Sequence, residues 1–170
     1  ALGNHAGLGI TTGADNIAIG YQAIDAADTE GNNLAIGKAA LGGSVAGGEY
    51  NVAIGNTALD ALTSSDYNVA MGYNAGTNLQ GGDGQNTIVG YDGGSALTSG
   101  GYNTLIGSQA NTVTTGGNNT LIGRLAGTSG SPVTVTTGSN VVCIGDSSIS
   151  AAHIQVDWTV ASDKRDKTDV

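Results

Sequence analysis

A five-residue block, Asn-x-Ala-Ile-Gly in its commonest early form, recurs at nearly constant intervals along most of this 170-residue chain. The final glycines of successive blocks are 17, 17, 18, 17, 18, 17, 16 and 22 residues apart. Such a period is typical of repeat proteins, in which each copy packs only on its neighbours. The copies are Asn16–Gly20, Asn33–Gly37, Asn51–Gly55, Asn68–Gly72, Asn86–Gly90, Asn103–Gly107, Asn119–Gly123, the looser Val141–Gly145, and a partial first copy, Ala1–Gly3.

The composition favours a stack of small residues over a compact globule or a disordered chain. The chain holds 30 Gly and one Pro, with 4% aromatic and 11% charged residues. So few large side chains would give a globule a poor core, and a disordered chain would carry more charge and more proline.

The block itself predicts a strand. All changes in repeat length lie outside the Asn-to-Gly block, including the five residues gained around 129–132. Insertions on one side of a fixed block indicate a strand joined to a variable loop. A weaker stretch, around Ile10, Leu62, Leu97 and Val113, predicts a second extended segment in each repeat, with Gly, Ser, Asp and Asn in the turns.

These observations predict an all-β fold, a parallel β-solenoid (β-roll) of about nine coils of 16–22 residues over positions 1–148. Helices are not expected, because Gly and β-branched residues recur too often. Both faces of the strand are apolar, which is the pattern of a strand buried on two sides. A thin coil covers one face only, so we expect an obligate oligomer, most simply a homotrimer. The sequence leaves open which face lines the three-fold axis.

The repeated Asn has two structural interpretations. Stacked amides can form a hydrogen-bonded ladder between coils, or each Asn can cap its own turn.

Charge and residue types exclude several kinds of partner. The formal net charge of −9 argues against nucleic acid. No run reaches the roughly 18 apolar residues of a membrane helix, so no membrane insertion is expected. His5 and His153 have no accompanying Cys or acidic cluster, so neither a metal site nor a cofactor is predicted.

Tyrosines occupy two recurring positions, five residues before the block glycine (Tyr50, Tyr67, Tyr102) or one after it (Tyr21, Tyr73, Tyr91). On adjacent coils Tyr50 with Tyr67, and Tyr73 with Tyr91, would be neighbours. They are candidate glycan contacts, or they shield the coil edges by packing on Gly.

The block with its following Ala resembles the head repeats of trimeric autotransporter adhesins, which are trimers of left-handed parallel β-rolls, and the related repeats of phage tail fibres. The resemblance covers about residues 1–148, although the adhesin repeats are shorter.

The C-terminal segment resembles a second family. Residues 149–161 suggest a closing strand or linker, with alternation over His153–Val160. Residues 162–170 look like the start of the intramolecular chaperone of phage tailspikes and fibres, which releases itself by self-cleavage. By this resemblance Ser162 is the nucleophile and Lys167 its base, with Asp163 and Arg165 as motif residues; a solvated charged tail is the alternative.

From these resemblances we expect a structural segment of a phage tail fibre or tailspike in the virion. It would support host attachment and end at a chaperone self-cleavage junction. The chain itself is not expected to be an enzyme, because the rest of the chaperone is missing from it, and we expect it to be a piece of a longer fibre. The alternative is a receptor- or glycan-binding adhesin head segment at a bacterial surface.

Overall fold

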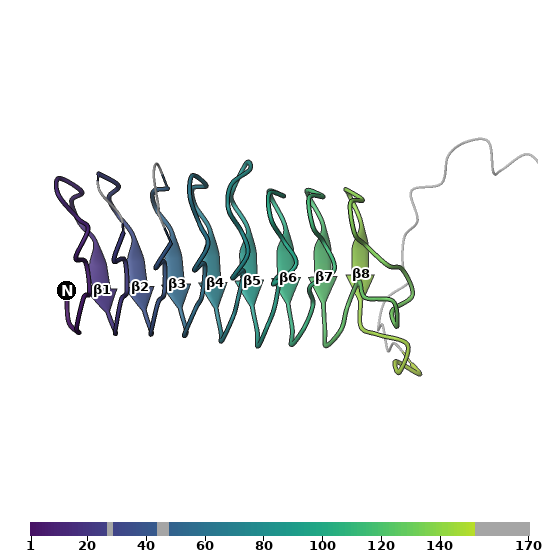
Figure 1. Cartoon of the computed structure of the whole chain (residues 1–170). Helices are drawn as coiled ribbons and strands as arrows, with labels where there is room; N and C mark the ends of the chain where they lie inside the picture. Colours follow the sequence, from purple (N-terminus) through teal and green to yellow (C-terminus); the bar gives the residue numbers. More distant parts are fainter. Residues whose placement is uncertain (27–28, 44–47, 152–170) are drawn as a thin grey trace, which may run out of the picture.

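A computed structural model of the chain describes residues 1–26, 29–43 and 48–151. It contains one parallel sheet of eight strands, ordered as they occur in the chain. After each strand the chain makes a circuit and returns beside that strand, so the fold is an elongated β-solenoid (Figure 1). The all-β parallel solenoid is therefore confirmed. The strands are β1 (Ile17–Ile19), β2 (Leu34–Ile36), β3 (Val52–Ile54), β4 (Val69–Met71), β5 (Thr87–Val89), β6 (Thr104–Ile106), β7 (Thr120–Ile122) and β8 (Val142–Ile144).

The coils stack in register, so that each block position lies beside the same position of the next coil. Ala35 pairs with Ala53, and Ile88 pairs with Leu105. Hydrogen bonds extend the ladder past both ends of each strand: the Ile17 N–H donates to the Asn33 carbonyl at 2.8 Å. The repeat period is thus converted directly into stacked columns of equivalent residues.

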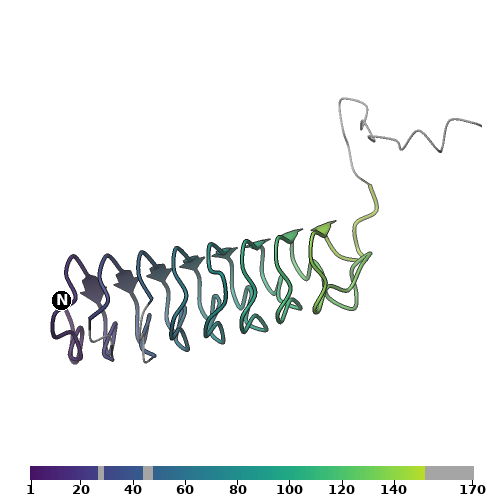
Figure 2. The same ribbon diagram turned by 90° about the horizontal axis from the view of Figure 1, so that it is seen from above.

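The predicted second extended segment is wrong for the described residues, in which each coil has one three-residue strand. The stretches around Leu62 and Leu97 lie among turns and bends. The N–H groups of Thr63 and Ser64 both donate to the Gln80 carbonyl, at 2.7 and 3.1 Å, in place of an alternating ladder. The pattern recurs from coil to coil, since the Gln80 N–H donates to the Thr98 carbonyl at 2.9 Å, but the stretches between turns are too short for a second strand. The solenoid therefore has one sheet and, opposite it, stacked turns (Figure 2).

The core is built from columns of buried side chains. The middle residue of every strand is buried, from Ala18 to Cys143. A column of small residues three after the block glycine is buried too, as are Leu62, Leu97 and Val113 from the stretch without a strand. The sequence predicts a strand at these last three residues, but in the structure they lie between turns and contribute buried side chains to the core.

The block glycine is required by both its backbone and its surroundings. Gly72 has φ of 137°, and a Cβ there would overlap the carbonyl oxygen of Gly90 on the next coil. Gly55 and Gly90 are in the same situation. Only glycine allows this close approach between coils.

The longest interval leaves the sheet intact. Between β7 and β8 the extra residues form a loop, in which Ser131 N–H donates to the Thr128 carbonyl at 2.9 Å. Thr120 still pairs with Val142, and Ile122 with Ile144. The insertion is therefore confined to the turn side, as predicted.

Candidate interaction surfaces

The outward face of the sheet presents apolar side chains along its whole length. The first and third residues of each strand point out, while the middle residue points into the core. Ile17 is 53% exposed, Met71 40% and Ile144 58%. The structure thus answers a question that the sequence left open, because it shows which of the two apolar faces the chain covers by itself.

The outward face is continuous but not uniform. The third position is aliphatic or Met in every strand, from Ile19 to Ile144. The first position is aliphatic from β1 to β4, then Thr from β5 to β7, and Val in β8. Because equivalent residues pair in register, these side chains form two parallel columns along the sheet. We call this surface the sheet face, and its residues are Ile17, Ile19, Leu34, Ile36, Val52, Ile54, Val69, Met71, Thr87, Val89, Thr104, Ile106, Thr120, Ile122, Val142 and Ile144.

The repeated Asn residues form a ladder between coils. The backbone N–H of Asn51 donates to Oδ1 of Asn33 at 2.9 Å, and Asn68 repeats this contact with Asn51 at 2.9 Å. The Nδ2 of Asn51 donates to the Ser65 carbonyl of the next coil at 3.0 Å. Asn68 is fully buried, and its Nδ2 also donates to Oδ1 of Asn51 at 3.0 Å. Because both ends of the amide bond to other coils, the side chain holds the stack together.

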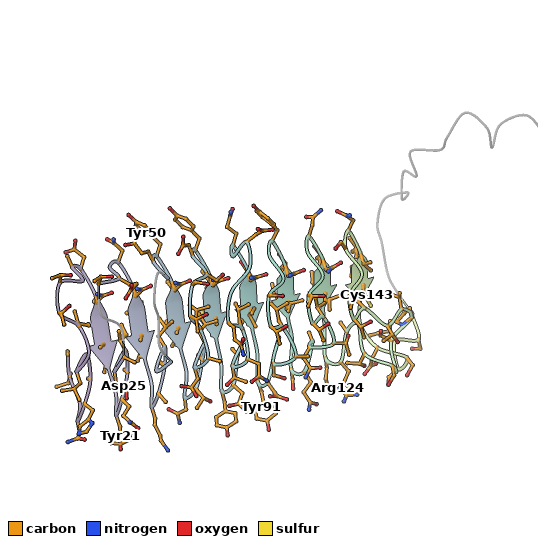
Figure 3. The ribbon with its side chains drawn as sticks, turned by 45° about the horizontal axis from the view of Figure 1, so that its top comes forward. Tyr21, Asp25, Tyr50, Tyr91, Arg124 and Cys143 are labelled. Carbon is orange, nitrogen blue, oxygen red and sulfur yellow. The ribbon has the colours of Figure 1, made fainter. Side chains whose placement is uncertain are left out.

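The tyrosines line the two long edges of the sheet. Figure 3 places Tyr50 on one edge, and Tyr21 and Tyr91 on the other. The rings of Tyr50 and Tyr67 are stacked with centroids 5.1 Å apart and planes 6° apart. Tyr73 and Tyr91 are stacked at 5.7 Å and 11°. The predicted neighbours thus pack on each other, and all remain about half exposed.

Sequence reasoning missed one polar residue on the first of these edges. Gln85 lies in the column of Tyr50 and Tyr67, five residues before its block glycine, and its side chain is exposed. Tyr102 holds the same position one coil later, as its offset from the glycine predicts. The same offset is the signal that would have added Gln85 to this group.

Acidic side chains are scattered on turns. Burial, and then the charge of Asp25, raise the pKa of Asp60. Asp25 lies at the edge that carries Tyr21 and Tyr91 (Figure 3). No three His, Cys, Asp or Glu side chains of the described residues are grouped to hold a metal ion. His5 contacts the Tyr21 ring instead, with centroids 6.2 Å apart.

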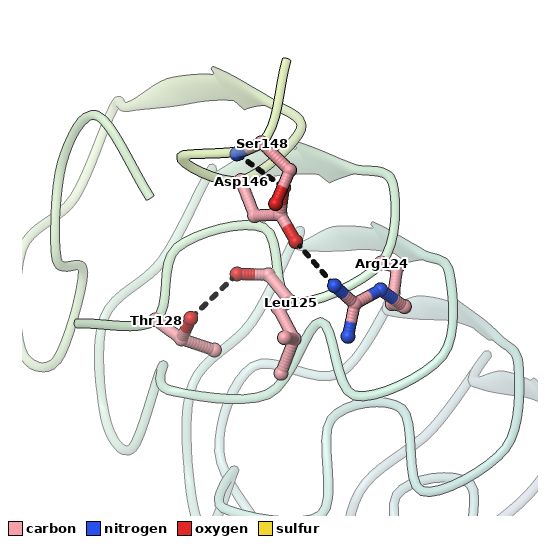
Figure 4. A network of polar contacts seen from close by, with 5 residues as sticks. All are labelled: Arg124, Leu125, Thr128, Asp146 and Ser148. Atoms are coloured by element: carbon pink, nitrogen blue, oxygen red, sulfur yellow. Dashed lines mark hydrogen bonds and ion pairs between the residues drawn. The ribbon is translucent and has the colours of Figure 1, made fainter. Parts of the chain in front are cut away.

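One ion pair joins the last coils (Figure 4). Arg124 Nη2 lies 2.9 Å from Oδ2 of Asp146, and the Ser148 N–H donates to Oδ1 at 2.9 Å. The Ser148 hydrogen bond, with help from Arg124, lowers the pKa of Asp146. Nearby, the Thr128 hydroxyl donates to the Leu125 carbonyl at 2.7 Å, which fixes the start of the long loop.

The residues assigned to the chaperone motif, Ser162, Asp163, Arg165 and Lys167, lie outside the described residues, as does the expected closing strand His153–Val160. No family model, curated protein or solved structure matches the chain. Among the described residues, no helix has the length and apolar character needed to cross a membrane.

Proposed function

We propose that this chain is a structural segment of a homotrimeric fibre, in which three parallel copies associate through the sheet face. The observation that carries the proposal is the unbroken run of outward aliphatic side chains along all eight strands. Monomeric soluble proteins rarely expose a large continuous apolar patch, and such patches mark association sites.

Parallel association suits the geometry of this surface. Each copy presents identical columns along its length, so in-register packing brings aliphatic rows of one copy against those of the next. A closed cyclic arrangement around an axis along the solenoid covers the face of every copy. The choice of three copies comes from the resemblance to adhesin heads and tail fibres.

In this proposal the segment has a mechanical role as a rigid spacer of a phage tail fibre or tailspike. A stack of coils linked by backbone hydrogen bonds and the Asn ladder supplies stiffness. Ser162 and Lys167 would form the self-cleavage pair of the full-length precursor. Ser162→Ala should then leave that precursor uncleaved on a denaturing gel, whereas cleavage at an unchanged rate would contradict the assignment.

The solution mass tests the trimer. Sedimentation equilibrium should give three times the 16.6 kDa chain mass. Ile54→Lys, in the middle of the sheet face, should dissociate the assembly because a lysine charge cannot be buried there unpaired. The matched control is Gln80→Lys on an exposed turn, which should leave the mass unchanged. A wild-type monomer, or an Ile54→Lys variant that stays trimeric, would contradict the proposal.

A further inference from the structure

Four consecutive coils present a polar and aromatic ridge along one edge of the sheet. The ridge consists of Tyr50, Tyr67, Gln85 and Tyr102, each five residues before its block glycine. Backbone hydrogen bonds hold the column together: Gln85 N–H donates to the Asp66 carbonyl at 3.0 Å, and Tyr102 N–H donates to the Gly84 carbonyl at 2.8 Å. The ridge thus belongs to the rigid stack.

The fold does not require aromatic rings at this position. Tyr50, Tyr67 and Tyr102 have φ of 58°, 57° and 60°, in the left-handed region that favours Gly, Asn and Asp. Asn32 and Asn118 hold the same position in other coils, with φ of 61° and 56°. The three rings therefore occupy sites where the backbone favours Asn, and they are half exposed rather than in the core.

The tyrosine position on the opposite edge lacks this conflict and serves as a reference. Tyr73 and Tyr91 follow the block glycine directly, and neither has a positive φ. Their column also contains the cations Lys38 and Arg124. Among the tyrosines of the two edges, therefore, only those of the first edge persist against the backbone preference, which points to a role in contact with another molecule.

Gln85 lies between the coils of two of these tyrosines. Tyr50 stacks on one face of Tyr67, so the other face of Tyr67 is directed toward the coil of Gln85. Tyr102 lies on the far side of that coil. With coils about 4.8 Å apart, the two rings are about 10 Å apart along the stack, with the exposed amide between them.

We propose that Tyr67, Gln85 and Tyr102 bind a sugar unit of an extended, uncharged glycan chain. The C–H face of a pyranose packs on an aromatic face, while a primary amide both donates to and accepts from neighbouring hydroxyls. The described residues enclose no pocket, so an open ridge suits a polymer laid along it better than a small isolated ligand.

Charge selects among glycans. Glu49 and Asp66 directly precede Tyr50 and Tyr67, and the exposed Asp83 lies beside Gly101, next to Tyr102. Like charges brought together oppose binding, so uronate or sialylated chains are disfavoured. The site lies within one chain and does not depend on the proposed trimer, so the binding activity and the fibre role can fail separately.

The test is calorimetric titration of the purified chain with soluble cello-, malto-, manno- and chito-oligosaccharides and with an anionic oligogalacturonate. At least one neutral series should bind, and the oligogalacturonate should not. Tyr67→Asn and Tyr102→Asn should each weaken binding about tenfold. Asn suits this backbone position, so both variants should keep the wild-type thermal midpoint. Gln85→Ala should weaken binding through lost hydrogen bonds.

The matched control is Tyr91→Asn, an equally exposed stacked tyrosine on the opposite edge, which should bind as the wild type does. Equal loss in that control would overturn the assignment of the edge. Failure of every neutral series to bind, or preference for the anionic chain, would overturn the proposal that the ligand is an uncharged glycan. A changed solution mass of Tyr67→Asn or Tyr102→Asn would mean that the rings contact a second copy instead.

Discussion

The first coils and the later coils fill the same core with large side chains from two different positions of the repeat. In the coils of β1 to β3 the buried middle residue of the strand is Ala, and the bulk comes from Ile24, Leu41 and Leu59, four residues after the block glycine. In the coils of β5 to β7 the strand supplies the bulk, as Ile88, Leu105 and Leu121. The position four after the glycine is then Gly94, Asn111 and Gly127.

Close contacts show that the two sets compete for one space. A Cβ on Gly94 would lie 3.0 Å from Cδ1 of Ile88 and 3.1 Å from Cδ1 of Leu105. At the junction, β4, both positions are small, and a Cβ on Gly76 would lie 3.0 Å from side-chain atoms of Leu59 and Ile88. The neighbouring coils therefore fill the junction from both sides. Each coil thus has a similar amount of side-chain volume in its core, but the position of the repeat that supplies this volume changes along the stack.

The early and later coils differ in the backbone strain at the position four residues after the block glycine. Ile24, Leu41 and Leu59 have φ of 47°, 49° and 51°, where a side chain with Cβ is strained by about 1–2 kcal/mol. Gly94 and Gly127 hold the equivalent position with φ of 58° and 80° and no such strain. The early coils are thus predicted to carry more local strain than the later ones.

The largest expected effect comes from deleting bulk in the later coils. Leu105→Gly should lower the free energy of unfolding by about 2–5 kcal/mol for the cavity, plus about 0.5–1 kcal/mol for glycine in a strand. Leu41→Gly creates a similar cavity but relieves the left-handed strain, so its loss should be smaller. Urea unfolding at one fixed chain concentration measures both. Equal losses would show that the strain at Leu41 is not real.

Adding bulk should break the later coils next. Gly94→Leu gives one coil both sources of volume, and overpacking with added backbone strain should cost at least about 1–3 kcal/mol. The control is Gly138→Leu, where φ is not positive and the nearest atoms to a Cβ are 3.9 Å away. Its midpoint in urea should stay near that of the wild type. A tolerated Gly94→Leu would contradict the shared-space interpretation.

Moving the large side chain from one position to the other within a single coil should recover part of the lost stability. Ala53→Leu overpacks and Leu59→Gly empties the same region, so the double variant should be more stable than the sum of the single effects predicts. We expect a coupling of about 0.5–3 kcal/mol from a double-mutant cycle. Simple additivity would show that the two positions do not share a space.

The smallest effect concerns a second difference between the regions. Five residues after the block glycine, the early coils have Asp25, Gly42 and Asp60, whereas Ser95 and Thr112 hold this position later. Because burial raises the pKa of Asp60, the folded chain binds more protons between the unfolded and folded pKa values, and stability falls as pH rises through that window.

Asp60→Asn should therefore raise the free energy of unfolding at about pH 7. It should have little effect at about pH 3, where the carboxyl is mostly protonated in both the folded and the unfolded chain. Thermal unfolding at the two pH values checks this. Asp25→Asn made first should reduce the gain, because Asp25 adds to the shift. A gain that is the same at both pH values would point to a cause other than ionisation.

Much of this fold could be predicted from residue spacing. The strands, their parallel order, their in-register pairing and the loop between β7 and β8 all follow from the repeat, because equal intervals bring equivalent residues together. The stacked tyrosine pairs followed in the same way, since a shared offset from the glycine becomes a shared column. Gln85 escaped notice because an amide among aromatic residues looks like an ordinary turn residue until the column is assembled.

The sequence by itself determined the period, the strand positions and the recurrence of glycine in every coil. Only the tertiary structure decided that one sheet forms rather than two, that Ala53 points in while Ile54 points out, and that Leu59 enters the core from a turn. The reason is that these outcomes depend on the direction of each turn. That direction is set by left-handed residues such as Tyr67 and Leu59, with φ of 57° and 51°, whose conformation their residue type does not reveal.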